Sequence, residues 1–392
     1  MLAKIPQVGA QYNLGDLFSG FGSFFGDQEK RFAAELSKYL PSRWVCFANS
    51  GLSAFYLILN ALKKSSSRKE VVLPAYTAPS LIVAVLKAGL KPILCDISLT
   101  DFNMDLKLLP QVITDQTLCV VPVHMFGIPV KNIEGVKQTI PGITVIEDCA
   151  QSFGSKINGK NTGVFSDISF TTFNRGKNLS TYGGGAVFTD SEEMSKQILQ
   201  EINTLAPQSP IFQIILPIKM AAITFALKPL IYGALFSAIA QFKDNAVPKD
   251  FEILKYSGFQ AGVGMSLLSK IDGSSEKRRR NGEALINSLA GIEGLIVPSV
   301  SKKCRPAFNR LPIVFKDIAA REKIEKALWR SGVDTSRMYL RPLHHIFNLG
   351  YRKEDFPKAV YFAQGLLTLP AHPFIKSRDV EMMIKVVKEE GV

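Results

Sequence analysis

Short apolar runs that end in polar residues alternate with segments of helical periodicity over the first part of the chain. Strands are predicted at 44–51, 70–76, 91–97, 118–127 and 143–150. Helices are predicted at 27–40, 52–64 and 80–89. This alternation is typical of βαβ units, so we predict an α/β fold with a mostly parallel sheet flanked by helices. Ligands of such a sheet bind beyond the carboxyl ends of its strands.

The rest of the chain predicts one more strand pair and then a second domain. A strand within 166–177 is followed by a return strand and helix in 183–194. After residue 245 the pattern predicts a long helix or helix pair at 259–291, followed by a smaller α+β unit. Its predicted elements are strands at 305–315 and 333–340, a helix at 319–332, and two terminal helices around 366–373. We therefore expect a large domain at 1–245 and a small domain at 246–392.

Residues 211–242 form the most apolar segment of the chain. Its longest uncharged run is the 14 residues from Pro229 to Phe242, which is short of the roughly 20 residues that a membrane-spanning helix needs. Three interpretations stay open: a buried helical pair or oligomer contact, a hairpin that docks on a membrane surface, and a transmembrane helix. The whole insertion is expected to cover about 206–245.

Composition narrows the function classes. The net charge is +13, but the basic residues are dispersed, with one tight cluster at 277–280. No motif for nucleic-acid binding accompanies them, so we expect anionic small molecules or a membrane surface as partners and no nucleic acid. Five cysteines without close spacing disfavour zinc and disulfide scaffolds. With no signal-peptide pattern at the N-terminus, we expect a cytoplasmic protein, with a peripheral position on the inner face of the membrane left open.

The candidate chemistry lies at two strand ends. Asp148 ends a predicted strand, and Lys177 follows it by 29 residues, just after another. Adjacent parallel strands would bring both to one mouth, where a half-buried lysine near Arg175 has a lowered pKa. A carboxylate paired with such a lysine is used by pyridoxal phosphate enzymes, although spacing alone leaves a structural ion pair equally open. The strand-to-helix turn at 50–53 offers N–H groups to a phosphate, and Thr172 a hydroxyl.

Several ordered blocks carry a resemblance to a known family. They are NSGLSAFYLILNAL at 49–62, VVLPAYTAPSLIVAVLKAGLKPILCDI at 71–97 with FNMD at 102–105, VPVHMFGIPV at 121–130, the run from VIEDCAQSFG to GGGAVFTD at 145–190, QAGVGMSLLSKID at 260–272 and TLPAHP at 368–373. With these blocks the chain resembles the DegT/DnrJ/EryC1/StrS family of sugar aminotransferases, from about residue 27 to the C-terminus and apart from 206–250. The resemblance implies an aspartate-aminotransferase type fold and pyridoxal 5'-phosphate as cofactor.

The resemblance also implies roles for individual residues. Lys177 is implied as the lysine that binds the cofactor aldehyde, Asp148 as the partner of the pyridine nitrogen, and Gln151 as a contact near the ring hydroxyl. The phosphate positions of the family fall on Ser50, Gly51, Leu52 and Thr172. No metal site is predicted. Arg175, Arg341 and His344 are weaker candidates for substrate contacts, while His372 and Cys149 are expected to be structural.

Some positions depart from the family pattern. Leu52 stands where a threonine is usual, and Ala78 where an aromatic side chain often stacks on the cofactor, so we expect Tyr76 or another group to cover that face. Three glycines, Gly183 to Gly185, replace a Gly-Glu-Gly-Gly stretch and are expected to allow a tight turn behind Lys177. The Asn-Tyr-Arg contact that a neighbouring subunit usually provides is replaced by 253–255, which weakens the expectation of a homodimer.

The function implied is transfer of an amino group from glutamate or glutamine to a keto sugar, nucleotide- or lipid-linked, in surface glycan biosynthesis. One alternative is a sugar dehydratase of the same fold, which in this family has histidine in place of Lys177. The other is a membrane-associated, non-catalytic scaffold or sensor with a vestigial cofactor site. The sequence does not identify the sugar, the carbon aminated or the amino donor.

Overall fold

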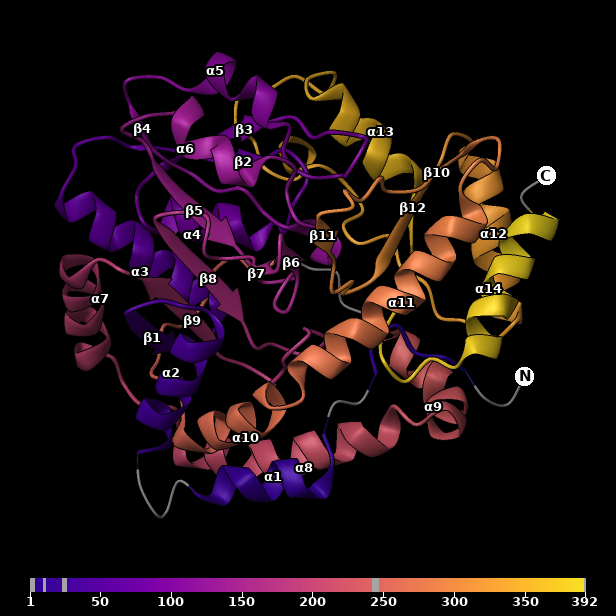
Figure 1. Ribbon diagram of the computed structural model, residues 1–392, viewed down its shortest axis with the longest axis horizontal. Coiled ribbons are helices and arrows are strands. Elements are labelled where there is room, and N and C mark those ends of the chain that lie inside the picture. Colours follow the sequence, from indigo (N-terminus) through magenta and orange to yellow (C-terminus); the bar gives the residue numbers. More distant parts are fainter. Residues whose placement is uncertain (1–3, 10–11, 23–26, 242–246, 391–392) are drawn as a thin grey trace.

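A seven-stranded sheet forms the centre of the computed structural model, which describes residues 4–9, 12–22, 27–241 and 247–390 (Figure 1). Its strand order is β1-β9-β8-β5-β4-β2-β3. The strands are β1 (Trp44–Ala48), β2 (Glu70–Pro74), β3 (Lys91–Cys95), β4 (Thr117–Val120), β5 (Thr144–Asp148), β8 (Ile168–Thr172) and β9 (Gly185–Thr189). Pairing is parallel except at β9, which is antiparallel to both β1 and β8. The predicted α/β class with a mostly parallel sheet is confirmed.

Helices cover both faces of this sheet because the strands are buried on both sides. One face packs against α3 (Gly51–Lys64), α4 (Ser80–Lys87) and α7 (Glu192–Thr204). The other packs against α2 (Gln28–Tyr39), α10 (Gly258–Leu268) and the short α5 (Leu109–Val112) and α6 (Val136–Thr139). Near-continuous apolar runs such as β2 are what a parallel sheet covered on both faces requires.

The C-terminal part adds a second, three-stranded sheet in the order β10-β12-β13. Its elements are α11 (Ile271–Leu289), β10 (Leu295–Ile296), β12 (Leu311–Phe315), α12 (Ile318–Arg330), α13 (Pro357–Gly365), β13 (Leu366–Leu369) and α14 (Ser377–Glu390). A third small sheet, β11-β6-β7, joins Cys304–Arg305 to the hairpin of Lys156–Ile157 and Lys160–Asn161. The helix pair expected at 259–291 is present as α10 and α11. The division at residue 245 stays a prediction.

The strand predicted at 333–340 was wrong. Residues Val333 and Ser336 make only isolated bridges, to Ile5 and Thr368. The neighbouring position in the sheet is taken instead by β13, whose four residues are all buried and pair in register with β12. Polar residues Asp334, Ser336 and Arg337 interrupt the earlier segment, so it has less apolar surface to contribute to a buried ladder.

The apolar segment after α7 folds as two helices, α8 (Pro210–Ala226) and α9 (Pro229–Gln241). Their axes bend by 95° at the break between them. Among the described residues no single helix is long and apolar enough to cross a membrane, and this bent pair reaches the required length and composition only jointly. Together with α1 (Leu14–Gly20), the pair lies along the lower rim of the molecule in Figure 1.

Candidate active site

Asp148 and Lys177 reach the same edge of the sheet by different routes. Asp148 is the last residue of β5, which pairs in parallel with β8, and lies opposite Phe170 in that register. β8 ends two residues later at Thr172, and the loop 173–184 that follows carries Lys177 before the chain returns as β9. Parallel neighbours end at one edge of a sheet. The expectation that adjacent strands bring the two residues to one mouth is therefore confirmed.

Hydrogen bonds from distant segments fix the loop around Lys177. The side-chain amide of Asn178 donates to the carbonyl oxygens of Phe153 (3.1 Å) and Ala307 (2.6 Å). The side-chain amide of Asn309 donates to the carbonyl oxygen of Gly176 at 2.7 Å. Gly176 has φ +80, a conformation that favours glycine. The lysine is thus held where the large sheet meets the C-terminal part of the chain.

Burial and mutual attraction set the charges of the pair. Burial lowers the pKa of Lys177 to about 8, against the opposing effect of the Asp148 carboxylate. Burial raises the pKa of Asp148 to about 6, although a hydrogen bond from the Ala150 N–H (2.8 Å) and the charge of Lys177 both work in the other direction. A neutral amine is accordingly accessible near physiological pH, which a lysine that attacks an aldehyde needs.

Arg310 is a member of this site that the sequence did not reveal. Its positive charge is the second cause, after burial and apart from Asp148, that lowers the pKa of Lys177. Its Nη1 is 3.6 Å from the sulfur of Met338, and its buried Nε has no hydrogen-bond partner among the described residues. Arg175, which we expected to tune the amine, is exposed and acts on Arg310 instead. The only sequence signal for Arg310 was a single charge within the mostly apolar run 306–315.

The phosphate positions meet where α3 begins. Ser50 is the N-cap of α3 and accepts a hydrogen bond from the Ser53 N–H at 3.0 Å. The N–H of Gly51 donates to the Thr172 hydroxyl at 3.3 Å, so this hydroxyl lies directly over the helix N-terminus. A Cβ on Gly51 would lie 2.5 Å from the Thr172 Cβ. The site therefore combines the backbone N–H groups of the first helical turn, the positive end of a 14-residue helix and two hydroxyls, as anion binding requires.

The three glycines behind Lys177 leave room for close neighbours that a side chain would displace. A Cβ on Gly185 would lie 2.5 Å from the Gly51 backbone nitrogen, and one on Gly184 would lie 2.1 Å from the Tyr256 ring. Gly183 and Gly184 also have φ of +151 and +98. The tight turn expected of them is confirmed, and Gly185 in addition lets the start of α3 approach β9 closely.

The other cofactor candidates have partners within the protein. The Oε1 of Gln151 accepts from the Phe126 N–H (3.0 Å), and its Nε2 contacts the Met125 sulfur (3.4 Å). Tyr76 is fully buried, and its hydroxyl donates to the carbonyl oxygen of Tyr339 at 2.7 Å. Leu52, in the first turn of α3, adds a backbone N–H but no hydroxyl. Tyr76 as the cover of the cofactor face stays a prediction.

A second candidate for such a cover is Tyr339. Burial raises the pKa of its phenol to about 12, Arg310 works in the opposite direction, and the Asp148 charge raises it further. Tyr339 thus lies within electrostatic reach of both Asp148 and Arg310. Its position in the sequence, 191 residues after Asp148, gave no hint of this proximity.

The remaining substrate candidates lie apart from this cluster. Arg341 is exposed. His344 packs its ring on Phe356 with centroids 5.1 Å apart and faces the Lys353 carbonyl oxygen at 3.4 Å. His372 is buried, and its Nε2 donates to the carbonyl oxygen of Pro6 at 2.9 Å, in keeping with a structural role.

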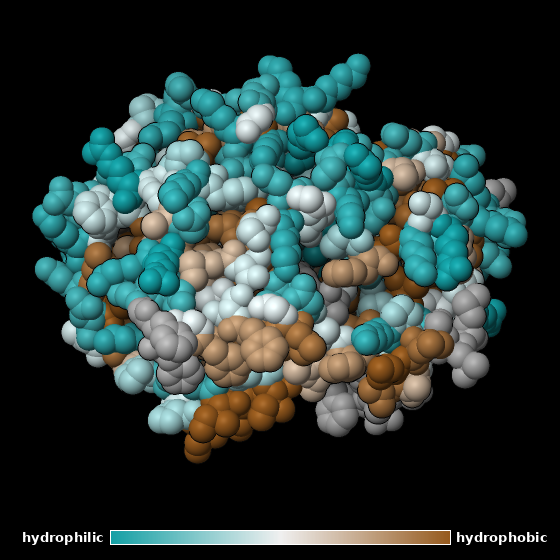
Figure 2. All heavy atoms as spheres, turned by 60° about the horizontal axis from the view of Figure 1, so that its bottom comes forward, coloured by the Kyte–Doolittle hydropathy of each residue, from teal (hydrophilic) through white to brown (hydrophobic). Residues whose placement is uncertain are grey.

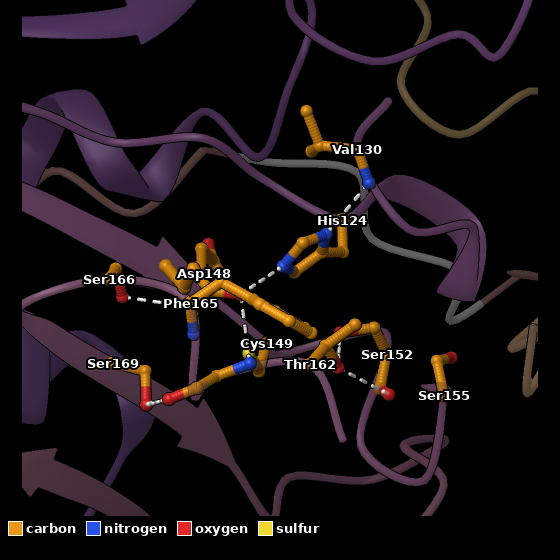
Figure 3. A network of polar contacts seen from close by, with 12 residues as sticks. His124, Val130, Asp148, Cys149, Ser152, Ser155, Thr162, Phe165, Ser166 and Ser169 are labelled. Atoms are coloured by element: carbon orange, nitrogen blue, oxygen red, sulfur yellow. Dashed lines mark hydrogen bonds and ion pairs between the residues drawn. The ribbon is translucent and has the colours of Figure 1, made fainter. Parts of the chain in front are cut away.

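His124, Glu147 and Cys149 form a buried polar network next to Asp148 in the chain. Figure 3 shows His124 and Cys149 close to Asp148. His124 Nδ1 accepts from the Val130 N–H at 2.9 Å, so its Nε2 carries the proton donated to Glu147, also at 2.9 Å. Burial alone would raise the pKa of Glu147, but hydrogen bonds, above all from His124, outweigh it and lower that pKa. Burial raises the pKa of the Cys149 thiol well above its usual range. His124 and Glu147 thus use their ring nitrogens and carboxylate for hydrogen bonds within the protein. The cluster therefore supports the end of β5.

The residues present fit pyridoxal phosphate. The helix N-terminus at Gly51, where a Cβ would fill the cradle, suits the phosphate. The buried Asp148 carboxylate suits a protonated ring nitrogen, and the partly buried Lys177 suits an aldehyde. The unpartnered Nε of Arg310 adds a cation beside them.

Comparisons with known proteins identify the family of this chain. The sequence model of the DegT/DnrJ/EryC1/StrS aminotransferase family matches residues 15–205 and 253–388. The dTDP-3-amino-3,4,6-trideoxy-alpha-D-glucose transaminase of Streptomyces venezuelae is 24% identical over 93% of this chain and 87% of its own. The UDP-N-acetyl-3-dehydro-alpha-D-glucosamine 3-aminotransferase of Acidithiobacillus ferrooxidans is 24% identical over 96% of this chain and 92% of its own.

A solved structure shares the fold. The sugar aminotransferase CalS13 from Micromonospora echinospora superposes with a TM-score of 0.80 at 19% identity, over 98% of this chain and 99% of that one. The resemblance inferred from the sequence is confirmed. This chain belongs to the DegT/DnrJ/EryC1/StrS aminotransferase family.

Proposed function

We propose that this protein is a pyridoxal-phosphate-dependent aminotransferase that transfers an amino group from glutamate or glutamine to a keto sugar, nucleotide- or lipid-linked, in surface glycan biosynthesis. The observation that carries the proposal is the Lys177 amine, with its pKa lowered to about 8, at the same sheet edge as the buried Asp148. Retention of Lys177 also favours amino transfer over the dehydratase alternative.

The cofactor, when bound, supplies an electron sink for the carbon that gains or loses the amino group. Ser50, Gly51, Leu52 and Thr172 would hold its phosphate at the start of α3. Asp148 would hold the proton on the ring nitrogen, because a buried carboxylate gains most from a charged hydrogen-bond donor. Gln151 would contact the ring hydroxyl. Lys177 would bind the aldehyde and, once released, move a proton at the reacting carbon as general base and acid.

Arg310 has a role in this proposal that its environment supports. A buried guanidinium nitrogen without a partner costs free energy until an anionic group satisfies it. Both the donor carboxylates and a sugar-linked phosphate are anionic, so we assign Arg310 to orient one of them, with Arg175 at the outer edge. Arg341 and His344 are retained as weaker candidates.

The substrate class follows from the relatives. The Streptomyces and Acidithiobacillus proteins are named for dTDP- and UDP-linked sugars, and we propose a keto sugar of this general kind. We further propose a homodimer, by analogy with the family, and a cytoplasmic location with peripheral membrane contact.

The test is the visible absorbance of cofactor bound to a lysine in purified protein, with borohydride reduction to make the bond permanent. We expect peptide mapping to find the label on Lys177, and Lys177→Ala to lose the band and more than about 1,000-fold of activity. Activity is measured as 2-oxoglutarate formed from glutamate with a panel of keto-sugar nucleotides. An unlabelled Lys177, or full activity of the alanine variant, would contradict the proposal.

A further inference from the structure

The exposed side of α8 carries a stripe of large apolar residues, although the polar residues Gln213 and Lys219 are exposed as well. Ile211, Ile214, Ile215, Ile218 and Phe225 lie on one stripe, and their exposed fractions run from 40% to 68%. The opposite stripe, with Leu216 and Met220, is buried. A helix that is apolar all round is normally covered on all sides. The outer stripe of α8 is therefore a surface that something else covers.

Neighbouring helices extend this stripe into one apolar rim. On α1 the exposed large apolar residues are Leu14, Phe18 and Phe21 at its C-cap, and on α9 they are Leu230, Ile231 and Leu235. We call these residues and the α8 stripe the apolar rim. Figure 2 shows hydrophobic residues gathered along the lower part of this face. Exposed apolar residues gathered in this way mark an interaction site in a folded protein.

The charges of the rim are all of one sign. The helices α1, α8 and α9 carry a single carboxylate, Asp16, which is buried and bonded to Ser266 and Lys270. Lys219 and Lys228 are exposed, and the Lys228 amine lies 4.7 Å from the Phe225 ring centroid. The apolar rim is thus flanked by cations, and the Lys228 amine lies over an apolar ring, as in helices that lie in a lipid headgroup layer.

A second copy of the chain is a poorer match for this surface. In a two-fold contact the same surface meets itself. Lys219 and Lys228 would then face helices that offer no exposed carboxylate. Anionic lipid headgroups supply the missing negative charge at the depth where the lysines end, while the acyl chains cover the isoleucines. The hairpin α8–α9 also falls in the stretch 206–252 that the family model leaves unmatched.

The hairpin is in direct contact with the site. Ile223 and Leu227 line a small pocket with Arg175 and Gly176, next to Lys177. At the start of α9 the Tyr232 hydroxyl bonds Asp334 at 2.7 Å, and Arg175 and Arg310 both act on the pKa of this phenol. The helices that carry the apolar rim therefore pack against the loop that carries Lys177.

We propose that the apolar rim formed by α1, α8 and α9 docks the protein on the surface of an anionic lipid bilayer, with Lys219 and Lys228 in the headgroup layer. The hairpin would then lie flat at the interface, because its 95° bend and two lysines suit an in-plane position better than a span. This inference does not need the proposed chemistry to be correct.

The test is flotation of the full-length protein with phosphatidylcholine vesicles that contain or lack phosphatidylglycerol. We expect binding to the anionic vesicles, and a loss of at least about tenfold in Ile214→Asp/Ile218→Asp, because each carboxylate opposes both insertion and surface charge. Leu86→Asp/Ile318→Asp is the matched control, since both residues are exposed and apolar but lie outside the rim. Lys219→Gln and Lys228→Gln should each weaken binding about fivefold at low salt.

Three results would overturn the proposal. They are no flotation of the wild type, equal flotation of the rim variant and the control, or a halved solution mass of the rim variant by light scattering, which would make the rim a subunit contact. Circular dichroism and thermal unfolding check that the variants fold. If Ile214→Asp/Ile218→Asp does not fold, the two lysine variants provide the test. Amino transfer to a soluble acceptor is measured in parallel, and its failure in all variants would affect only the proposed function.

Discussion

Single charged residues decide how the lysine at the site behaves. Asp148 raises the pKa of Lys177 and Arg310 lowers it, on top of the larger effect of burial. The two neighbours therefore act in opposite directions on one measurable quantity. The sequence left open whether Asp148 and Lys177 form only a structural ion pair, and this pKa can test that alternative.

We predict that cofactor-free protein captures pyridoxal phosphate faster as the pH rises, with a midpoint at about 8, because only the neutral Lys177 amine attacks the aldehyde. Asp148→Asn should move the midpoint to lower pH, and Arg310→Gln should move it to higher pH. The measurement is stopped-flow absorbance across a pH series. Shifts of both variants in the same direction would contradict the assigned neighbours.

A glycine at the phosphate cradle gives a second prediction. Gly51→Ala places a methyl group 2.5 Å from the Thr172 Cβ, so either β8 or the start of α3 must move. Overpacking of this kind costs about 1–3 kcal/mol, and we expect at least about tenfold weaker cofactor binding by titration. Gly273→Ala on α11, where nothing lies within 4 Å of the new Cβ, is the control and should bind normally. Equal affinities would remove Gly51 from the cradle.

The residues that the sequence could identify are those beside recognisable local patterns. Asp148 ends a strand, and Lys177 and Ser50 each follow one, so their placement at one sheet edge could be predicted. Arg310 and Tyr339 enter through long-range packing of the C-terminal part onto that edge, which no local pattern encodes. Residue roles at the cofactor remain predictions until the labelling and pH experiments are done.

At the scale of elements, the end of β5 depends on a buried carboxylate. Glu147 accepts hydrogen bonds from the N–H groups of Gly163 and Phe165, both at 2.8 Å, from the Ser166 hydroxyl and from His124. These bonds join β5 to the loop before β8 and to the end of β4. The next residue along β5 is Asp148, so this network also positions the site.

We predict that Glu147→Gln lowers the free energy of unfolding by about 2–4 kcal/mol, because the amide nitrogen of glutamine cannot accept the bonds that a carboxylate oxygen does. Denaturant unfolding measures this. Glu134→Gln, at an exposed glutamate that bonds Asn158 at 2.9 Å, should change little. A loss confined to the control, or equal losses, would show that the network is not what supports β5.

Helices and strands were predicted correctly where the apolar pattern of the segment allowed only one kind of element. The strands β1 to β5 could be predicted from their apolar runs, and α3 and α4 from their helical periodicity. The segment 333–340 was misread because its alternating residues are compatible with a strand, whereas pairing with β12 depends on which segment supplies more apolar surface, and β13 does. The choice between two competing edge segments is a tertiary effect.

At the scale of the whole molecule, the packing of the apolar-rim helices against the Lys177 loop gives a prediction about substrates. On anionic vesicles, wild type should aminate a lipid-linked keto sugar faster than Ile214→Asp/Ile218→Asp, because docking raises the local concentration of acceptor. With a soluble nucleotide-linked acceptor the two should have equal kcat/KM. A rate difference with the soluble acceptor would mean that the substitutions disturb the site itself.

The hydrogen bond from Asn309 to Gly176, which clamps the Lys177 loop, has a consequence for how the protein is made. Asn309 holds the carbonyl of Gly176 across 133 residues of chain, while the β8–β9 hairpin that carries the loop closes locally. A ribosome adds roughly 5–20 residues per second, so the clamp can form only on the order of ten seconds after the hairpin has been synthesised. The nascent chain therefore displays an unclamped lysine loop first. Firm retention of the cofactor becomes a late event of biosynthesis, reached only once the C-terminal part has emerged.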